Sequence, residues 1–206
     1  IKLTKKLVHE WLGNEKVDYG KKEKKDQVGT VTGLAYTSFG GDILQIEATR
    51  FTGKGRLVLT GQLGDVMKES ASIALDYVRT HANEFKIDPK LFEENDVHIH
   101  VPEGAVPKDG PSAGVTMTTA LVSCFSNIPV KANLAMTGEV TLRGNVLPIG
   151  GLKEKSLAAH RSGIDTILIP KENVKDLDDV PQEVKDAVTF IPCSNVSQVL
   201  HNALVK

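Results

Sequence analysis

Hydrophobic and polar residues follow patterns along the chain that predict both strands and helices. Short alternating or β-rich runs bounded by turn residues predict strands within residues 28–37, 42–49, 56–61 and 96–101. Apolar residues at helical intervals predict helices over 65–85, 113–126, 152–163 and 195–204. A hairpin turning at Arg143-Gly144-Asn145 is predicted within 133–151, and a strand at 165–170. Because these elements are mixed without strict strand–helix–strand alternation, the pattern favours an α+β fold over a doubly wound sheet.

The first 26 residues differ in character from the remainder of the chain. Residues 1–13 predict a short helix that Thr4 caps and Gly13 ends, and a charged connector follows at 20–27. We therefore place a domain boundary after residue 26, with one main domain over 27–206. The short helix is expected to be the end of an upstream part of a longer protein.

Composition narrows the functional classes. The chain has 206 residues, 40% of them hydrophobic, and a net charge of −1, as is ordinary for a soluble globular protein. The near-neutral charge gives no sign of nucleic-acid binding, and the apolar runs are too short to span a membrane. No signal peptide is visible. Two cysteines without metal-ligand spacing point to a reducing compartment, so we expect a cytoplasmic protein.

The sequence around Ser112, "VPKDGPSAGV", allows two interpretations of the role of this serine. Ser112 precedes an apolar helix, where serine is a favoured N-cap. It also lies where free N–H groups around residues 109–113 and the helix dipole would form an oxyanion hole for a nucleophile. "GPSAG" matches the G-x-S-x-G elbow of α/β-hydrolases, with Asp178 or Asp179 before His201 in the required order. About ten residues of loop between the preceding strand and Ser112 argue against that elbow.

A nucleophilic serine needs a base, and two kinds of residue are candidates. His98 and His100 point to one face of a predicted strand, where the pattern favours residues that face solvent or pack in a cleft over a catalytic base. Without a third ligand nearby they do not indicate a metal site. Lys155 falls on the narrow face of its predicted helix, beside Leu152 and Ala159. Burial there would lower its pKa and make it a base. The alternative is a lysine that snorkels to solvent from the helix edge.

Three motifs in order resemble the peptidase domain of the Lon ATP-dependent proteases, of the A type. They are "PKDGPSAG" around Ser112, "MTGEVTLRG" with Thr137, and "LPIGGLKEK" with Lys155. The resemblance runs from about Gln27 to the C-terminus and includes "VTGLAYTSFGGDILQIE", "GKGRLVLTGQLGDVMKES" and "HIHVPEGAVPKDG". It implies a Ser–Lys dyad with Ser112 as nucleophile and Lys155 as base, and Thr137 as the threonine that hydrogen-bonds the lysine. Glu47, His100 and Asp109 lie in matching segments and are candidates for a second shell around the site or for purely structural roles.

The resemblance also implies a fold and a larger context. The fold would be the family's α+β fold, related to the second domain of a small-subunit ribosomal protein. The whole family protein is a hexameric ring that degrades unfolded, misfolded and regulatory proteins, with an ATPase module that uses ATP and Mg. This chain contains no G-x-x-x-x-G-K-[ST] loop, and we expect "FTGKG" at 51–55 to be a turn between strands. We therefore expect no cofactor in this domain. The other class considered is a non-catalytic binding module on the same fold, against which the presence of both dyad members argues.

Overall fold

The computed structural model describes residues 2–13, 25–37, 40–102 and 108–205, so most of the connector predicted at 20–27 lies outside the described residues. In chain order the elements are α1 (Lys5–Leu12), β1 (Thr30–Thr37), β2 (Gly40–Thr52), β3 (Leu57–Thr60), α2 (Asp65–Thr80), α3 (Leu91–Glu94), β4 (Asn95–His100), the 3-10 helix η1 (Pro111–Ala113), α4 (Gly114–Ser126), β5 (Leu134–Met136), β6 (Glu139–Val140), β7 (Val146–Leu147), α5 (Leu152–Arg161), β8 (Thr166–Pro170), the 3-10 helix η2 (Lys171–Asp179), α6 (Gln182–Ala187), β9 (Thr189–Cys193) and α7 (Val196–Ala203).

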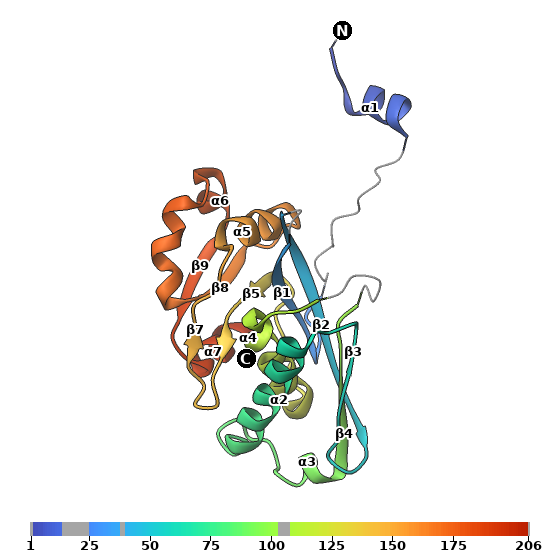
Figure 1. Ribbon diagram of the computed structural model, residues 1–206, viewed down its shortest axis with the longest axis vertical. Coiled ribbons are helices and arrows are strands. Elements are labelled where there is room, and N and C mark those ends of the chain that lie inside the picture. The colour runs from blue at the N-terminus through green and yellow to red at the C-terminus, as the bar shows by residue number, and fades with distance from the viewer. Residues whose placement is uncertain (1, 14–24, 38–39, 103–107, 206) are drawn as a thin grey trace.

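A seven-stranded mixed sheet forms the centre of the main domain, with the strand order β3-β4-β2-β1-β5-β8-β9 (Figure 1). β2 is antiparallel to both of its neighbours, β1 and β4. The pairs β3–β4, β1–β5, β5–β8 and β8–β9 are parallel. The hairpin predicted around Gly144 is confirmed as the separate two-stranded sheet β6–β7.

Helices cover the sheet on both faces because the apolar side chains of its central strands alternate between two cores. One core lies under α2, α4 and α7 and receives Ile46 from β2 and Leu168 from β8. The other lies under α5 and α6 and receives Ile43 and Ile167 from the same two strands. A strand whose successive side chains enter opposite cores is buried on both faces.

The sheet is open at one place that matters for the site. β1 pairs with β5 only at Thr32 and Gly33, whereas it pairs with β2 along its whole length. β5 ends at Met136, so the two strands are no longer paired beyond that point. Residues from the helical layers on opposite faces can approach one another at this opening.

Most sequence-based expectations for the fold are confirmed. The predicted strands and helices are present, and Thr4 caps α1 by accepting a hydrogen bond from Leu7 N–H at 3.3 Å. The mixture of α and β structure is as predicted, but the C-terminal half differs from the expected lack of alternation. There α5 lies between β5 and β8, and α6 lies between β8 and β9, although the β6–β7 hairpin is inserted after β5. β5, β8 and β9 are all parallel. β5 and β9 were not predicted as separate strands.

Candidate active site

Ser112 lies in the 3-10 turn η1, immediately before α4. Its side chain makes no capping hydrogen bond to either helix start, so the interpretation as an N-cap is wrong. The flanking glycines have separate reasons. Gly110 has φ 125°, which favours glycine, and a Cβ on Gly114 would come within 2.8 Å of Val140 N.

The segment before Ser112 is fixed to the start of α2. The backbone of Lys108 pairs with the turn before that helix, accepting from Gly64 N–H at 2.7 Å. Asp109 Oδ1 accepts from Met67 N–H and from Gly110 N–H, each at 2.9 Å. The carboxylate thereby caps α2 from outside that helix. Its bond to Gly110, together with the missing N–H of proline at position 111, removes two of the donors considered for the oxyanion hole.

Lys155 lies in α5 on the opposite face of the sheet and is 2% exposed. The expected narrow face is confirmed, because Leu152, Ser156 and Ala159 are buried beside it, and the snorkelling alternative is wrong. Burial lowers the pKa of Lys155 from 10.5 to about 8. Among the described residues no carboxylate forms an ion pair with it. An unpaired buried ammonium group loses its proton readily.

Thr137 links the two layers. It directly follows β5 at the opening of the sheet, and its Oγ1 accepts a hydrogen bond from Lys155 Nζ at 3.1 Å. The same hydroxyl donates to the carbonyl oxygen of Ser112 at 3.5 Å. That carbonyl also accepts from Gly138 N–H at 2.8 Å. Thr137 therefore contacts both the lysine side chain and the backbone of the serine.

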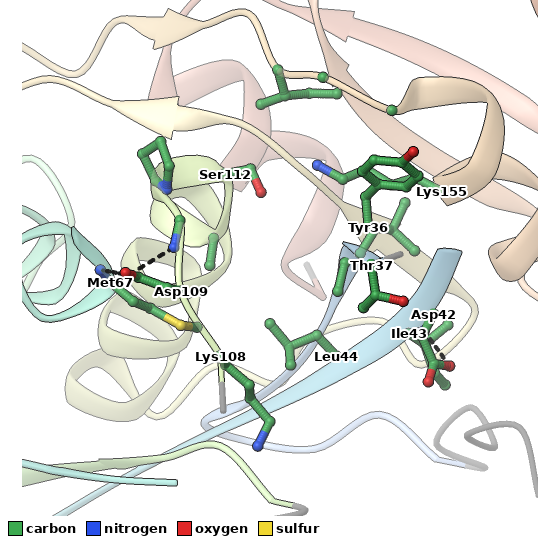
Figure 2. A pocket seen from close by; sticks show the side chains of 18 of the residues that line it. Tyr36, Thr37, Asp42, Ile43, Leu44, Met67, Lys108, Asp109, Ser112 and Lys155 are labelled. Atoms are coloured by element: carbon green, nitrogen blue, oxygen red, sulfur yellow. Dashed lines mark hydrogen bonds between the residues drawn. The ribbon is translucent and has the colours of Figure 1, made fainter. Parts of the chain in front are cut away.

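Ser112 and Lys155 both line one pocket of about 500 Å³. Their side chains point toward each other across it (Figure 2). The other walls come from the end of β1, the start of β2, Met67 of α2 and residues 148–151. The pocket thus lies at the opening between β1 and β5, and it brings a hydroxyl group together with a lysine of lowered pKa.

Two of the three second-shell candidates lie elsewhere. His100 and His98 share one partner, because His100 Nδ1 is 2.7 Å and His98 Nε2 is 2.8 Å from Thr60 Oγ1. Glu47 pairs with His100 across β2 and β4, and neither is among the pocket-lining residues. Asp109 is the candidate that lines the pocket, and its contacts fix the serine loop.

The α/β-hydrolase alternative is not supported by the geometry. η1 intervenes between the loop and α4, and no strand leads directly into Ser112. His201 lies in α7 and lines a different pocket, near Leu200 and Leu204. Within the described ranges, no group of three or more His, Cys, Asp or Glu residues is placed to hold a metal ion. No described helix is long and apolar enough to span a membrane.

Three contributors to the site were missed by sequence reasoning. A Cβ on Gly41 would lie 2.0 Å from the carbonyl oxygen of Glu154, so β2 passes directly against the backbone of α5. Tyr36 lines the pocket. Asn173 is buried and bonds the pocket-lining segment 148–151. Of these three, only Gly41 carries a signal in the sequence, as one of the two adjacent glycines at 40–41.

A buried lysine of lowered pKa opposite a serine at the start of a helix is the kind of site found in serine peptidases. The family described as Lon protease (S16) C-terminal proteolytic domain matches residues 2–206. The chain belongs to this family and is a serine peptidase domain. It is 58% identical over 206 residues to a Lon protease of Brevibacillus choshinensis, 60% over 205 residues to one of Bacillus thuringiensis, and 56% over 205 residues to Lon protease 1 of Bacillus subtilis. The matches cover all of this chain but only 26% of each of these relatives, so the chain spans about a quarter of their length.

Proposed function

We propose that the chain hydrolyses peptide bonds with Ser112 as nucleophile and Lys155 as general base. The observation that carries this proposal is the pair of side chains facing each other across the pocket, with burial lowering the pKa of Lys155 to about 8. At pH 7 about a tenth of such a lysine is neutral, against about 0.03% at the ordinary pKa of 10.5. Burial therefore makes the free base about 300 times more abundant.

In the first half-reaction the neutral Lys155 amine takes the proton of Ser112 as Oγ attacks the substrate carbonyl carbon. The carbonyl π electrons move to oxygen, and the N–H groups of Ser112 and Ala113 in η1 stabilise that charge, because Gly114 N–H and Val115 N–H already donate to backbone carbonyl groups. The intermediate collapses as the C–N bond breaks, and the Lys155 ammonium gives its proton to the leaving amine. Water then attacks the acyl-serine by the same route, which releases the acid and restores Ser112. Thr137 holds Lys155 Nζ in position throughout.

The test is peptidase activity of the Ser112→Ala variant together with labelling by a fluorophosphonate. The wild-type chain is expected to hydrolyse an unstructured fluorogenic peptide and to be labelled at Ser112. Ser112→Ala should lose both properties with an unchanged far-ultraviolet circular dichroism spectrum, because the Ser112 side chain makes no capping bond that the fold needs. Substantial hydrolysis by a contaminant-free Ser112→Ala preparation would contradict the assignment.

We propose further that this domain acts within a larger protein, on the ground that the chain covers about a quarter of its relatives. In that protein an ATPase module outside 27–206 would use ATP and Mg to unfold substrates, and a cytoplasmic hexameric ring would degrade unfolded, misfolded and regulatory proteins. Residues 1–26 would be the end of that module. The relation of the fold to a ribosomal protein domain stays a prediction.

The 27–206 domain itself is expected not to bind ATP. "FTGKG" ends β2 with Phe51 and Thr52, and its last three residues lie in the predicted turn before β3. Lys54 N–H donates to Asp96 Oδ1 at 2.7 Å. A loop whose N–H groups already bind a carboxylate is not a phosphate cradle. Saturable micromolar binding of ATP in a calorimetric titration would contradict this expectation.

A further inference from the structure

Residues 148–151 form a wall of the pocket between β7 and α5. The pairing of β7 with β6 ends at Leu147, so the next residues leave that sheet. Ile149 packs its side chain against the core under α5, which keeps this part of the backbone at the edge of the protein interior. Its N–H and C=O groups therefore need hydrogen-bond partners from outside a regular strand.

Asn173, in η2, supplies both partners. Its Oδ1 accepts from Ile149 N–H at 2.9 Å, and its Nδ2 donates to Ile149 C=O at 2.8 Å. This pair of bonds to one residue reproduces what an opposing residue of an antiparallel strand would provide. Asn173 is 2% exposed. The second Nδ2 proton goes to Asp176 Oδ2 at 2.6 Å, so Asp176 fixes which side of the amide faces each group.

We propose that Asn173 is a positioning residue for peptide substrates, which holds residues 148–151 as a fixed wall of the binding pocket, with Asp176 orienting its amide. The inference rests on the proposed function, since it takes the pocket at Ser112 to be the place where the peptide lies. Gly150, next to Ile149, has open space where a Cβ would be. Its backbone is accessible for hydrogen bonding along an extended peptide.

The two hydrogen bonds from Asn173 to Ile149 affect peptide binding more than they affect Ser112 and Lys155. Lys155 is held separately, by its own burial and by the 3.1 Å bond to Thr137. Ser112 is held from the other face, through Asp109 and the start of α2. Without the Asn173 amide, the N–H and C=O groups of Ile149 would have to bond water, which would displace the wall. The contacts that hold Ser112 and Lys155 would remain.

The experiment compares two probes of Ser112 on the 206-residue chain. A tripeptidyl boronate needs the wall and the serine, whereas a small alkyl fluorophosphonate needs the serine and lysine alone. For Asn173→Ala we expect the Kd of the peptidyl boronate to rise about 10-fold, which is the size of the loss of one hydrogen bond between the peptide and the displaced wall. The rate and the pH midpoint of fluorophosphonate labelling should stay those of the unchanged protein. Asp176→Ala, which keeps both bonds to Ile149, should give a smaller rise.

Asn95→Ala is the matched control, because Asn95 Nδ2 donates to Leu91 C=O at 2.9 Å and does not line the pocket. It should lower the melting temperature and leave both probes unaffected. An unchanged boronate Kd in folded Asn173→Ala overturns the inference, as does an equal loss with both probes. If Asn173→Ala does not fold, an unchanged Kd in Asp176→Ala overturns it. The proposed function fails separately, if Ser112→Ala is still labelled by the fluorophosphonate.

Discussion

Replacing Lys155 by methionine is expected to stabilise the fold while it abolishes peptidase activity. Lys155 is 2% exposed and has Thr137 as its hydrogen-bond partner, so at neutral pH the folded protein keeps an ammonium group away from water. Methionine has an unbranched side chain of similar length that adapts to irregular apolar surroundings. The substitution therefore removes an unfavourable buried charge and retains the packing.

The magnitude follows from the pKa of Lys155, which burial lowers from 10.5 to about 8. At about 1.4 kcal/mol per pKa unit, the charged form costs the folded state about 3 kcal/mol at pH 7. The substitution also removes the hydrogen bond to Thr137, which lowers the free energy of unfolding by about 1 kcal/mol. The net gain in the free energy of unfolding is therefore about 2 kcal/mol. The folded state releases its proton near pH 8 and the unfolded state near 10.5. The unfolded state thus binds more protons between these values, so wild-type stability from this group rises with pH over that window.

The assay is urea denaturation of both proteins at pH 7 and pH 9.5. Lys155→Met should be more stable by about 2 kcal/mol at pH 7, and the difference should close to about zero at pH 9.5, where most of the penalty in the wild-type protein has gone. A Lys155→Met variant that is less stable than wild type at pH 7 would refute the reasoning. A stability difference that does not change with pH would show that Lys155 is not the group responsible.

Three further expectations concern the residues that support the site or the sheet. Gly41→Ala should lower kcat/KM for a fluorogenic peptide about 10- to 100-fold, because the new Cβ would lie 2.0 Å from Glu154 C=O and must shift α5; an unchanged value would contradict the contact. Asp109→Ala should cost about 1 kcal/mol in urea denaturation, through the lost cap at Met67 N–H, and should slow fluorophosphonate labelling. Normal labelling would show that the serine loop does not depend on this anchor. Asp96→Asn should be less stable than wild type at pH 7, because hydrogen bonds from backbone N–H groups lower the pKa of Asp96 from 3.8 to about 2. The difference in the free energy of unfolding should disappear as the pH falls from about 4 to below about 2. A difference that stays constant with pH would contradict this expectation.

The parts of the fold predicted from sequence are those whose signal is local. Alternating strands such as 96–101 and the narrow helical face of Lys155 depend on residues close together in the chain. β5 was not predicted as a strand because its three residues are all buried, so its sequence shows no alternation of apolar and polar residues. β9 lies at the edge of the sheet, includes Pro192 and has a single fully buried residue. Neither strand carries the period of two on which recognition depends.

The supporting residues of the site could not be predicted for a different reason. Asn173 bonds a residue 24 positions away, and Gly41 touches a helix more than 100 positions later in the chain. The two histidines converge on Thr60, about 40 positions earlier. Each of these pairings is created by the order of strands in the sheet, and a single sequence contains no local pattern for it. Asp109 was named as a candidate, but its bond to Met67 N–H appears only in the structure.

The proposed nucleophile and the proposed base come from opposite faces of one sheet, and this arrangement explains why the site requires the whole domain. Ser112 belongs to the layer of α2 and α4, and Lys155 belongs to the layer of α5. The two meet because β1 and β5 stop pairing after Gly33, and Thr137 fills the opening with bonds to both residues. The layer of α5 buries Lys155 and thereby lowers its pKa, so the ability of the lysine to act as a base depends on packing on that face of the sheet. The position of the serine is a property of packing on the other face. A substitution that shifts either layer against the sheet is therefore expected to reduce peptidase activity before it unfolds the protein.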